Sequence, residues 1–448
     1  MPATNGLYLF SHDLRVQDNA ALSEAAAACD RLLCVYCIDE AWLKPNRYGV
    51  RSLGSHRARF LAESLNDLGR ALADLNQRLV VIHGDPAKLV AGLVKRFDIA
   101  RVFRSEPVGV YEQWQWNALQ RLAPQARYTV RNTHTLFTRD RLPSSLIELP
   151  DTFSSFRRKV EALAVADPVT APSALPRPPL LPAELLTPSL VLEDALVGTA
   201  TNRFHGGTTA GQRHVERYLE RRLADSYKAV RNALDGWDNS SKWSAWLAHG
   251  CLSAREVLAA LRDYESRYAA TESSYWLYFE LLWREYFQWY ALANGRQLFS
   301  FRGIRGKRPM TTFYPARLTA WQQGTTPFPL VNACMNELRS TGYLSNRGRQ
   351  IAASCLVNEL ALDWRYGAAW FEHLLVDYDV ALNWGNWQYQ AGVGADPRGP
   401  RHFNLAKQAE QFDPDGRYTG RWADFDVSPA AMIDYVDASD WPITDRSR

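Results

Sequence analysis

Short apolar runs alternate with helical stretches along the first third of the chain. The runs cover residues 6–10, 31–38, 78–84, 100–104 and 127–133, and the segments between them carry apolar residues at helical spacing. Alternating strands and helices are typical of a parallel sheet with helices on both faces. The pattern predicts that residues 1–140 form an α/β domain with a doubly wound, Rossmann-like parallel sheet.

The composition then shifts to prolines and small residues, as in PSALPRPPLLPAELLTPSL. Proline has no backbone N–H and fixes φ, so such a segment cannot continue a regular helix or a central strand. We therefore expect an interdomain connector over residues 141–205.

From residue 206 to residue 448 the apolar periodicity becomes almost wholly helical. Long periodic segments include TESSYWLYFELLWREYFQWYALANG and NRGRQIAASCLVNELALDWRYG. The second domain is therefore predicted to be all-α. Two domains also suit a length of 448 residues, which exceeds the usual size of one hydrophobic core.

Composition narrows the class of protein. A hydrophobic fraction of 46% is ordinary for a globular protein, and a net charge of +4 is too small by itself to indicate nucleic-acid binding. No stretch has the apolar length of a membrane span, and the N-terminus lacks a signal-peptide pattern, which predicts a cytoplasmic protein. Cys34 and Cys37 form a C-x-x-C, but a strand sends them to opposite faces, so buried thiols are favoured over a redox or zinc pair and no metal site is expected.

Two segments of the helical half carry polar groups near predicted helix starts and faces. Tyr227 and the turn NSSKWS supply hydroxyls and N–H groups that suit a phosphate, although a plain helix cap explains the turn as well. Glu280, Trp283 and Arg284 share one helix face. They can hydrogen-bond and stack on a planar ligand, and a surface salt bridge beside a core tryptophan is the alternative.

Two further segments are harder to explain as core. Asn346 and Arg349 lie one turn apart at the start of a predicted helix. In DYDVALNWGNWQY, Asp377 and Asp379 are followed by Asn383 and a cluster of indoles. Burying so many polar groups is costly unless they have a task, so this segment favours function.

In their order and spacing, the four segments resemble the FAD-binding domain of the photolyase/cryptochrome family. The start LYLFSHDLRVQDNAAL, with Asp13, Arg15, Asp18 and Asn19, is similar to the first strand and turn of that family. The segments LRSTGYLSNRGRQ, NWGNWQYQAGVGADPRG and FDPDGRYTGRW resemble the DASH cryptochrome branch. A match of several segments is far more specific than any one motif.

The resemblance implies a U-shaped FAD and a role for each matching position. Asn383 would face the flavin N5, where a neutral amide favours states that a carboxylate resists. Asp377 would be the charge partner of Arg349. The residues implied for the phosphates and ribityl chain are Tyr227, Ser240, Ser241, Lys242 and Ser244. Those implied around the rings are Glu280, Arg284, Asn346, Arg349, Asp377, Asp379 and Asn383.

The resemblance also implies a chain of tryptophans that refills the photoexcited flavin. Trp387 and Trp364 occupy the flavin-proximal and middle positions of the family. At the surface position this chain has Thr311 in place of tryptophan. Tyr314, or a branch through Trp384, is left as the substitute.

A substrate cavity over the flavin is implied as well, with repair of cyclobutane pyrimidine dimers as its chemistry. Glu280 and Trp283 would hold the flipped dimer, assisted by Asn346. Gln350 and Tyr389 are polar where relatives that repair double strands carry methionine and tryptophan. This difference favours single-stranded DNA as the substrate. RNA or looped duplex DNA are further expected partners. The cations implied for the DNA backbone are Arg347, Arg398 and Arg401.

The N-terminal domain would carry a light-harvesting antenna, most often methenyltetrahydrofolate. Glu112 lies where a pterin-binding carboxylate occurs in relatives, although an acid at a helix start is also simple dipole compensation. The competing function is a blue-light photoreceptor that uses the same flavin chemistry to signal. The short stretch after YTGRW speaks against a switch built on a long tail. We expect a monomer.

Overall fold

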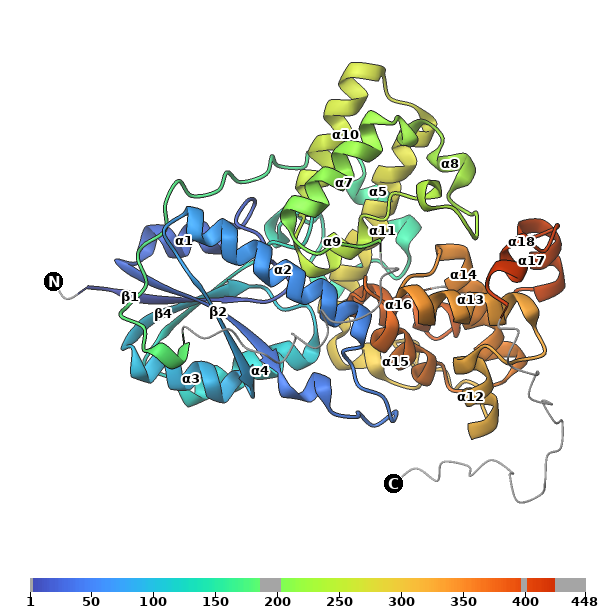
Figure 1. Cartoon of the computed structure of the whole chain (residues 1–448), viewed down its shortest axis with the longest axis horizontal. Coiled ribbons are helices and arrows are strands. Elements are labelled where there is room, and N and C mark those ends of the chain that lie inside the picture. The colour runs from blue at the N-terminus through green and yellow to red at the C-terminus, as the bar shows by residue number, and fades with distance from the viewer. Residues whose placement is uncertain (1–2, 186–202, 396–400, 424–448) are drawn as a thin grey trace.

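The computed structural model describes residues 3–185, 203–395 and 401–423 (Figure 1). Its N-terminal part contains one five-stranded parallel sheet in the order β3-β2-β1-β4-β5. This confirms the predicted doubly wound sheet, and each strand lies within a few residues of its expected position. The strands are β1 (Asn5–Phe10), β2 (Arg31–Asp39), β3 (Leu79–Gly84), β4 (Ile99–Ser105) and β5 (Arg127–Arg131).

Alternate residues of the strands feed two separate layers of core. Tyr8 and Phe10 pack with the helices of one face, and Leu7 and Leu9 pack with those of the other. Side chains of a strand alternate between the two faces of the sheet. Because helices cover both faces, each strand is apolar along its whole length. The first face carries α1 (Ala20–Ala28) and α2 (Ser55–Asp74), and the second carries α3 (Pro86–Arg96) and α4 (Val110–Leu122).

The two cysteines of the C-x-x-C are buried in this sheet and unpaired. Burial raises the pKa of the Cys37 thiol to about 12, so the thiolate that redox or zinc chemistry requires is disfavoured. The described residues contain no cluster of three metal-ligating side chains, and no helix among them is long and apolar enough to cross a membrane.

A short helix lies inside the segment expected to be a connector. α5 (Phe153–Val160) starts at Thr152, whose side chain accepts a hydrogen bond from the Ser155 N–H. Phe153 then stacks on Trp283 with ring centroids 3.8 Å apart, which ties α5 to the helical half. The proline-rich part that follows contains only the single-turn helix Ala183–Leu185 among its described residues.

The rest of the described chain is helical, as predicted. α11 is the long central helix, and it starts with a capping box at Thr271. The helices are α7 (Thr208–Glu220), α8 (Tyr227–Val230), α9 (Ser244–His249), α10 (Ala254–Tyr268), α11 (Glu272–Asn294), α12 (Pro315–Gln323), α13 (Pro329–Thr341), α14 (Asn346–Ser354), α15 (Trp364–Leu374), α16 (Val380–Gln390), α17 (Leu405–Phe412) and α18 (Arg417–Arg421).

The periodic segment NRGRQIAASCLVNELALDWRYG is not one helix. α14 runs into a π-helical turn at Cys355–Glu359 and ends there. Ala361 then adopts a left-handed φ of 52°, and Asp363 caps the start of α15. The break falls where apolar spacing is uninterrupted, because a π turn changes the backbone without changing the residue types.

The two halves share buried polar links as well as core. Arg255 of α10 makes a two-pronged ion pair with Asp18, with N···O distances of 2.8 and 3.0 Å. Arg15 donates to the carbonyl oxygens of Gly250 and Thr133. At Gly250 a Cβ atom would lie 1.9 Å from the His12 carbonyl oxygen, so only glycine permits this approach.

Candidate functional site

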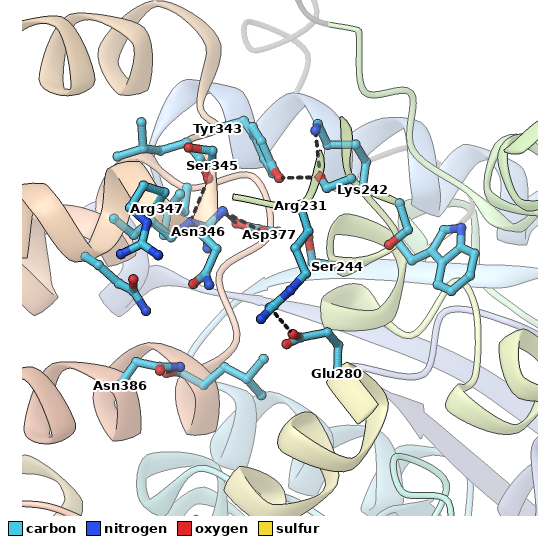
Figure 2. Close-up of a pocket in the computed structure, with 18 of the residues that line it drawn as sticks. Arg231, Lys242, Ser244, Glu280, Tyr343, Ser345, Asn346, Arg347, Asp377 and Asn386 are labelled. Carbon is cyan, nitrogen blue, oxygen red and sulfur yellow. Dashed lines mark hydrogen bonds and ion pairs between the residues drawn. The ribbon is translucent and has the colours of Figure 1, made fainter. Parts of the chain in front are cut away.

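A cavity of about 930 Å³ opens between α8, α9, α11, α14 and α16 (Figure 2). It lies at the upper end of the size range of ligand pockets. Segments more than a hundred residues apart in sequence meet around it. The predicted site residues that line it are Tyr227, Ser240, Ser241, Lys242, Ser244, Glu280, Trp283, Arg284, Asn346, Arg347, Arg349, Gln350, Asp377, Asp379, Asn383, Trp387 and Tyr389.

One wall is the turn before α9. Lys242 is buried there with a left-handed φ of 58°, and its Nζ donates to the Ser240 hydroxyl at 2.7 Å. Among the described residues, the hydroxyls of Ser241 and Ser244 have no hydrogen-bond partner. A cation beside free hydroxyls, on a backbone held in an unfavourable conformation, is an arrangement suited to an anionic group.

The opposite wall is built around a fixed ion pair. Arg349 Nη2 lies 2.9 and 2.8 Å from the two carboxylate oxygens of Asp377. Arg349 Nε donates to the Leu344 carbonyl oxygen at 2.9 Å, so the guanidinium is held from both sides. Burial lowers the pKa of Arg349, but the charge of Asp377, its hydrogen bond and the neighbouring acidic groups together raise it, which keeps the pair ionised.

Asp379 and Asn383 are one helical turn apart at the start of α16. Asp379 caps the helix by accepting from the N–H groups of Ala381 and Leu382, and it also accepts from Gln288 at 2.7 Å. Asn383 Nδ2 donates to the Ala368 carbonyl oxygen at 3.0 Å. Within the described residues its amide oxygen has no partner, so a polar, uncharged atom remains available in the wall.

Arg284 fixes the floor of the cavity to the N-terminal half. Its guanidinium donates to the carbonyl oxygen of His134 and, at 3.3 Å, to that of Leu247. Burial lowers the pKa of Arg284, while Asp379 opposes that change. The charge is therefore compensated across the cavity by an acid on α16.

α11 supplies the aromatic and acidic rim. Trp283 is stacked on Phe153, and the Tyr389 ring stands edge-on to it at 6.2 Å. Glu280, one turn earlier, accepts from Arg231 at 2.7 Å (Figure 2). Burial raises the pKa of Glu280 and the Arg231 charge opposes it.

The tryptophans fall into two pairs in ring contact. Trp387 lines the cavity, and its ring centroid lies 6.2 Å from that of Trp321. Trp364 is fully buried outside the cavity lining, 5.9 Å from Trp384. Tyr314 instead packs under the guanidinium of Arg317. Of the two substitutes for a surface tryptophan, Trp384 is the one that contacts Trp364.

Arg231, Trp276 and Tyr343 are among the lining residues that sequence reasoning did not assign to the site. Trp276 precedes Glu280 by one helical turn and Arg231 follows Tyr227 by one turn. Helical spacing around the recognised residues was thus the signal that could have found two of them.

Two family models match the chain, one in each half. Residues 6–178 match the family model described as DNA photolyase, and residues 276–431 match the FAD binding domain of DNA photolyase. A protein of Idiomarina loihiensis named Cryptochrome DASH is 48% identical over 98% of this chain and 96% of its own length. Its namesake from Vibrio parahaemolyticus is 45% identical over 98% and 97%.

This chain belongs to the photolyase/cryptochrome family, in its cryptochrome DASH branch.

Solved structures of the family have the same fold. A cryptochrome from Synechocystis superposes with a TM-score of 0.89 at 34% identity, covering 94% of this chain and 89% of its own. A class III photolyase from Agrobacterium tumefaciens gives 0.80 at 25% identity, covering 94% and 87%.

FAD is the cofactor of this DASH cryptochrome, and the chemistry of the cavity fits it. The partnerless hydroxyls of Ser241 and Ser244 beside Lys242 suit the phosphates. The paired charges of Arg349 and Asp377, with the amide of Asn383, suit the polar edges of flat rings. Bound FAD would supply blue-light absorption and an excited-state electron donor, which no side chain of the protein provides.

Of the remaining predicted residues, Arg401 and Glu112 lie outside the cavity lining. The Arg401 guanidinium lies 4.9 Å from the Tyr389 ring and donates to its hydroxyl, so it borders the rim, whereas Arg398 is outside the described residues. Glu112 is in the first turn of α4, where it borders a separate cavity of about 50 Å³. That volume holds a water molecule or two and not a pterin.

Proposed function

We propose that this DASH cryptochrome splits cyclobutane pyrimidine dimers in single-stranded DNA, driven by blue light through reduced FAD. The observation that carries the proposal is that Glu280 and Trp283 border the same cavity as the FAD-binding groups. A dimer against these side chains would be next to the flavin, where electron transfer needs no large motion. The anion that forms in the dimer requires stabilisation by donors already in position.

Each rim residue has a task in this reaction. Trp283, fixed from behind by Phe153, offers a rigid face on which a pyrimidine stacks. Glu280 hydrogen-bonds a pyrimidine carbonyl and stabilises the charge that develops there. Asn346 assists from α14. Arg347 and Arg401 attract the backbone phosphates.

Single strands are favoured because two of the rim groups are polar. Tyr389 turns a hydroxyl toward Arg401, and Gln350 adds an amide, so the rim offers a flipped dimer less apolar contact. Flipping a base pair out of a duplex costs a few kcal/mol, much of which a single strand has already lost. Because the rim offers little apolar contact, binding in the cavity does not offset this free-energy cost in duplex DNA.

Two accessory tasks complete the proposal. Trp387 and Trp364, with Trp384 as the outer member, pass electrons from solvent reductants to the flavin. A methenyltetrahydrofolate antenna would lie at the junction of the two halves, outside the cavity of about 50 Å³ that Glu112 borders. There Tyr111 of α4 contacts Phe299 of the helical half, with ring centroids 5.7 Å apart.

The test is anaerobic blue-light repair of a thymine dimer in a single-stranded oligonucleotide and in the matching duplex, with photoreduced protein. Repair of the single strand with little repair of the duplex is expected. Trp283→Ala should abolish it, while Trp114→Ala, an exposed aromatic of the N-terminal half, serves as the matched control. No repair of either substrate by fully reduced protein would contradict the proposal and favour a photoreceptor.

A further inference from the structure

The Glu280 carboxyl already has a partner inside the cavity, and the partner comes from another element. Arg231, directly after α8, places Nη1 2.7 Å from Glu280 Oε1 (Figure 2). Its guanidinium carbon lies 4.2 Å from the ring centroid of Trp276, one turn before Glu280 on α11. Ring and carboxylate together hold the guanidinium across the rim. Within the described part of the chain, no other charged side chain contacts Glu280.

A second guanidinium lies close to the first without a carboxylate of its own. Arg347 donates to the Asn232 side chain at 3.4 Å, and its buried Nε has no partner among the described residues. Burial, and then the charge of Arg231, lower the pKa of Arg347. The rim thus carries the two positive charges of Arg231 and Arg347, and the Glu280 carboxylate balances only one of them. This excess of positive charge favours the binding of an anion.

A backbone phosphate is the anion that could displace the Glu280 carboxylate. The pair is partly exposed, with 21% of the Arg231 side chain and 34% of the Glu280 side chain accessible, so water screens their attraction. A phosphate diester accepts two parallel hydrogen bonds from a guanidinium and can also approach Arg347. The exchange therefore replaces a weak ion pair by a stronger contact.

Loss of Arg231 changes the state of the carboxyl. The titratable groups that interact electrostatically with Glu280 are Arg231 and Tyr227, both on the α8 side, and the Arg231 charge also lowers the pKa of Arg347 on α14. Burial raises the pKa of the Tyr227 phenol well above its usual value, so it stays neutral. With Arg231 withdrawn, no positive charge opposes the upward effect of burial on the pKa of Glu280, so the carboxyl holds a proton more readily.

We propose that Arg231 is a positioning residue that couples the arrival of a backbone phosphate to the protonation of Glu280. In the empty cavity Arg231 holds Glu280 as a carboxylate. When a strand binds, the guanidinium moves to a phosphate and the carboxylate takes one proton from water. The neutral acid then donates its O–H to a pyrimidine carbonyl oxygen. The coupling rests on the proposed function, because it requires a nucleic-acid strand in this cavity.

Infrared difference spectroscopy of the FAD-loaded, full-length protein tests the coupling. The probe is single-stranded oligothymidylate, compared with the same oligonucleotide carrying uncharged methylphosphonate linkages. The phosphodiester strand should produce the carbonyl band of a protonated carboxyl, and Glu280→Gln should remove that band. The uncharged strand should produce little or none of it.

Two substitutions separate Arg231 from a general effect of charge. Arg231→Met should show the protonated band before any strand is added, and Arg231→Lys should behave like the wild type at reduced phosphate affinity. Arg221→Met is the matched control, because Arg221 makes an exposed ion pair with Asp238 outside the cavity lining. It should show the band only with the phosphodiester strand.

Binding is measured in parallel by fluorescence anisotropy of the labelled strands. A phosphodiester strand that binds and is repaired when damaged, but produces no protonated band, overturns the coupling and leaves the proposed function intact. A band of equal size with the uncharged strand also overturns it. A strand that does not bind at all overturns both.

Discussion

Asn383 places an amide, rather than an acid, in the buried wall of the FAD cavity. Its Nδ2 is committed to the Ala368 carbonyl oxygen, so the orientation of the group is set by the fold. A carboxylate at this position would remove the hydrogen bond to the Ala368 carbonyl oxygen. It would also add a negative charge to a cavity in which the flavin gains electrons. We therefore propose that the neutral side chain influences the redox properties of the cofactor.

Asn383→Asp should lower the midpoint potential of the bound FAD by tens of millivolts, on the scale of about 59 mV per tenfold change for one electron. An anaerobic redox titration measures it. The control is Asn117→Asp, which adds the same charge to an exposed position of α4 outside the cavity lining. Equal shifts in the two variants would mean that the added charge of the protein, and not its position in the cavity wall, sets the potential.

The tryptophan pairs make a second prediction at this scale. Trp364→Phe and Trp384→Phe should each slow blue-light reduction of oxidised FAD severalfold, because their rings are in contact and phenylalanine is much harder to oxidise. Absorbance during illumination with a thiol reductant measures the rate. Trp370→Phe, whose ring contact is with His373, should leave the rate unchanged. A normal rate in Trp384→Phe would exclude it as the outer member.

Among the elements, α16 depends on Asp379 both as its cap and as a cavity residue. Asp379→Ala should lower the free energy of unfolding by about 1 kcal/mol, because the helix cap is lost. It should also weaken FAD binding, because Gln288 and Arg284 lose their acidic partner. Thermal unfolding and FAD titration of the apoprotein measure the two effects. Ser253→Ala, which removes the cap of α10, should lower stability with FAD affinity preserved. Equal FAD affinities in the two variants would rule out the second role.

What the sequence could predict also differs between elements. The alternation of apolar runs was enough to predict the sheet, since both its faces are covered, and the periodic segment TESSYWLYFELLWREYFQWYALANG matches α11 to within one residue at each end. The break after α14 could not be read from spacing, because the π turn and the left-handed Ala361 leave the apolar periodicity unchanged. Arg231 lies one helical turn after Tyr227, so spacing could have placed it near the cavity. Its ion pair with Glu280 of α11 could not be predicted, because the two elements are far apart in sequence.

Across the whole molecule, the cavity is positioned by polar groups that cross between the two halves. Arg284 and Glu285 are consecutive on α11, and both bind the segment that leaves the last strand of the sheet. Arg284 donates to the His134 carbonyl oxygen, and Glu285 accepts from the backbone N–H groups of Leu136 and Phe137. The N-terminal half thus fixes the position of α11 at the rim of the FAD cavity. We call the contacts of Arg284 and Glu285 with this segment the anchor of α11.

Glu285 should give this anchor a measurable pH dependence. The side chain is fully buried, and burial raises its pKa from 4.5 to about 7 despite three hydrogen-bond donors. Between pH 4.5 and pH 7 the folded protein then holds a proton that the unfolded chain has released. The free energy of unfolding therefore falls as the pH rises through this window, by at most about 3 kcal/mol from this group.

Glu285→Gln removes the titrating group and keeps an acceptor for the backbone N–H groups. Urea unfolding at fixed FAD concentration should show a smaller loss of stability between pH 5 and pH 8 in the variant than in the wild type. Burial also raises the pKa of Glu337 to about 7, so the same loss persists from that group in both proteins and only the difference between them reports Glu285. Glu337→Gln, at the far side of the cavity, should reduce the pH dependence without disturbing the link to the N-terminal half. Parallel profiles for wild type and Glu285→Gln would mean that the three donors keep Glu285 ionised in the fold, and that the anchor is a permanent carboxylate.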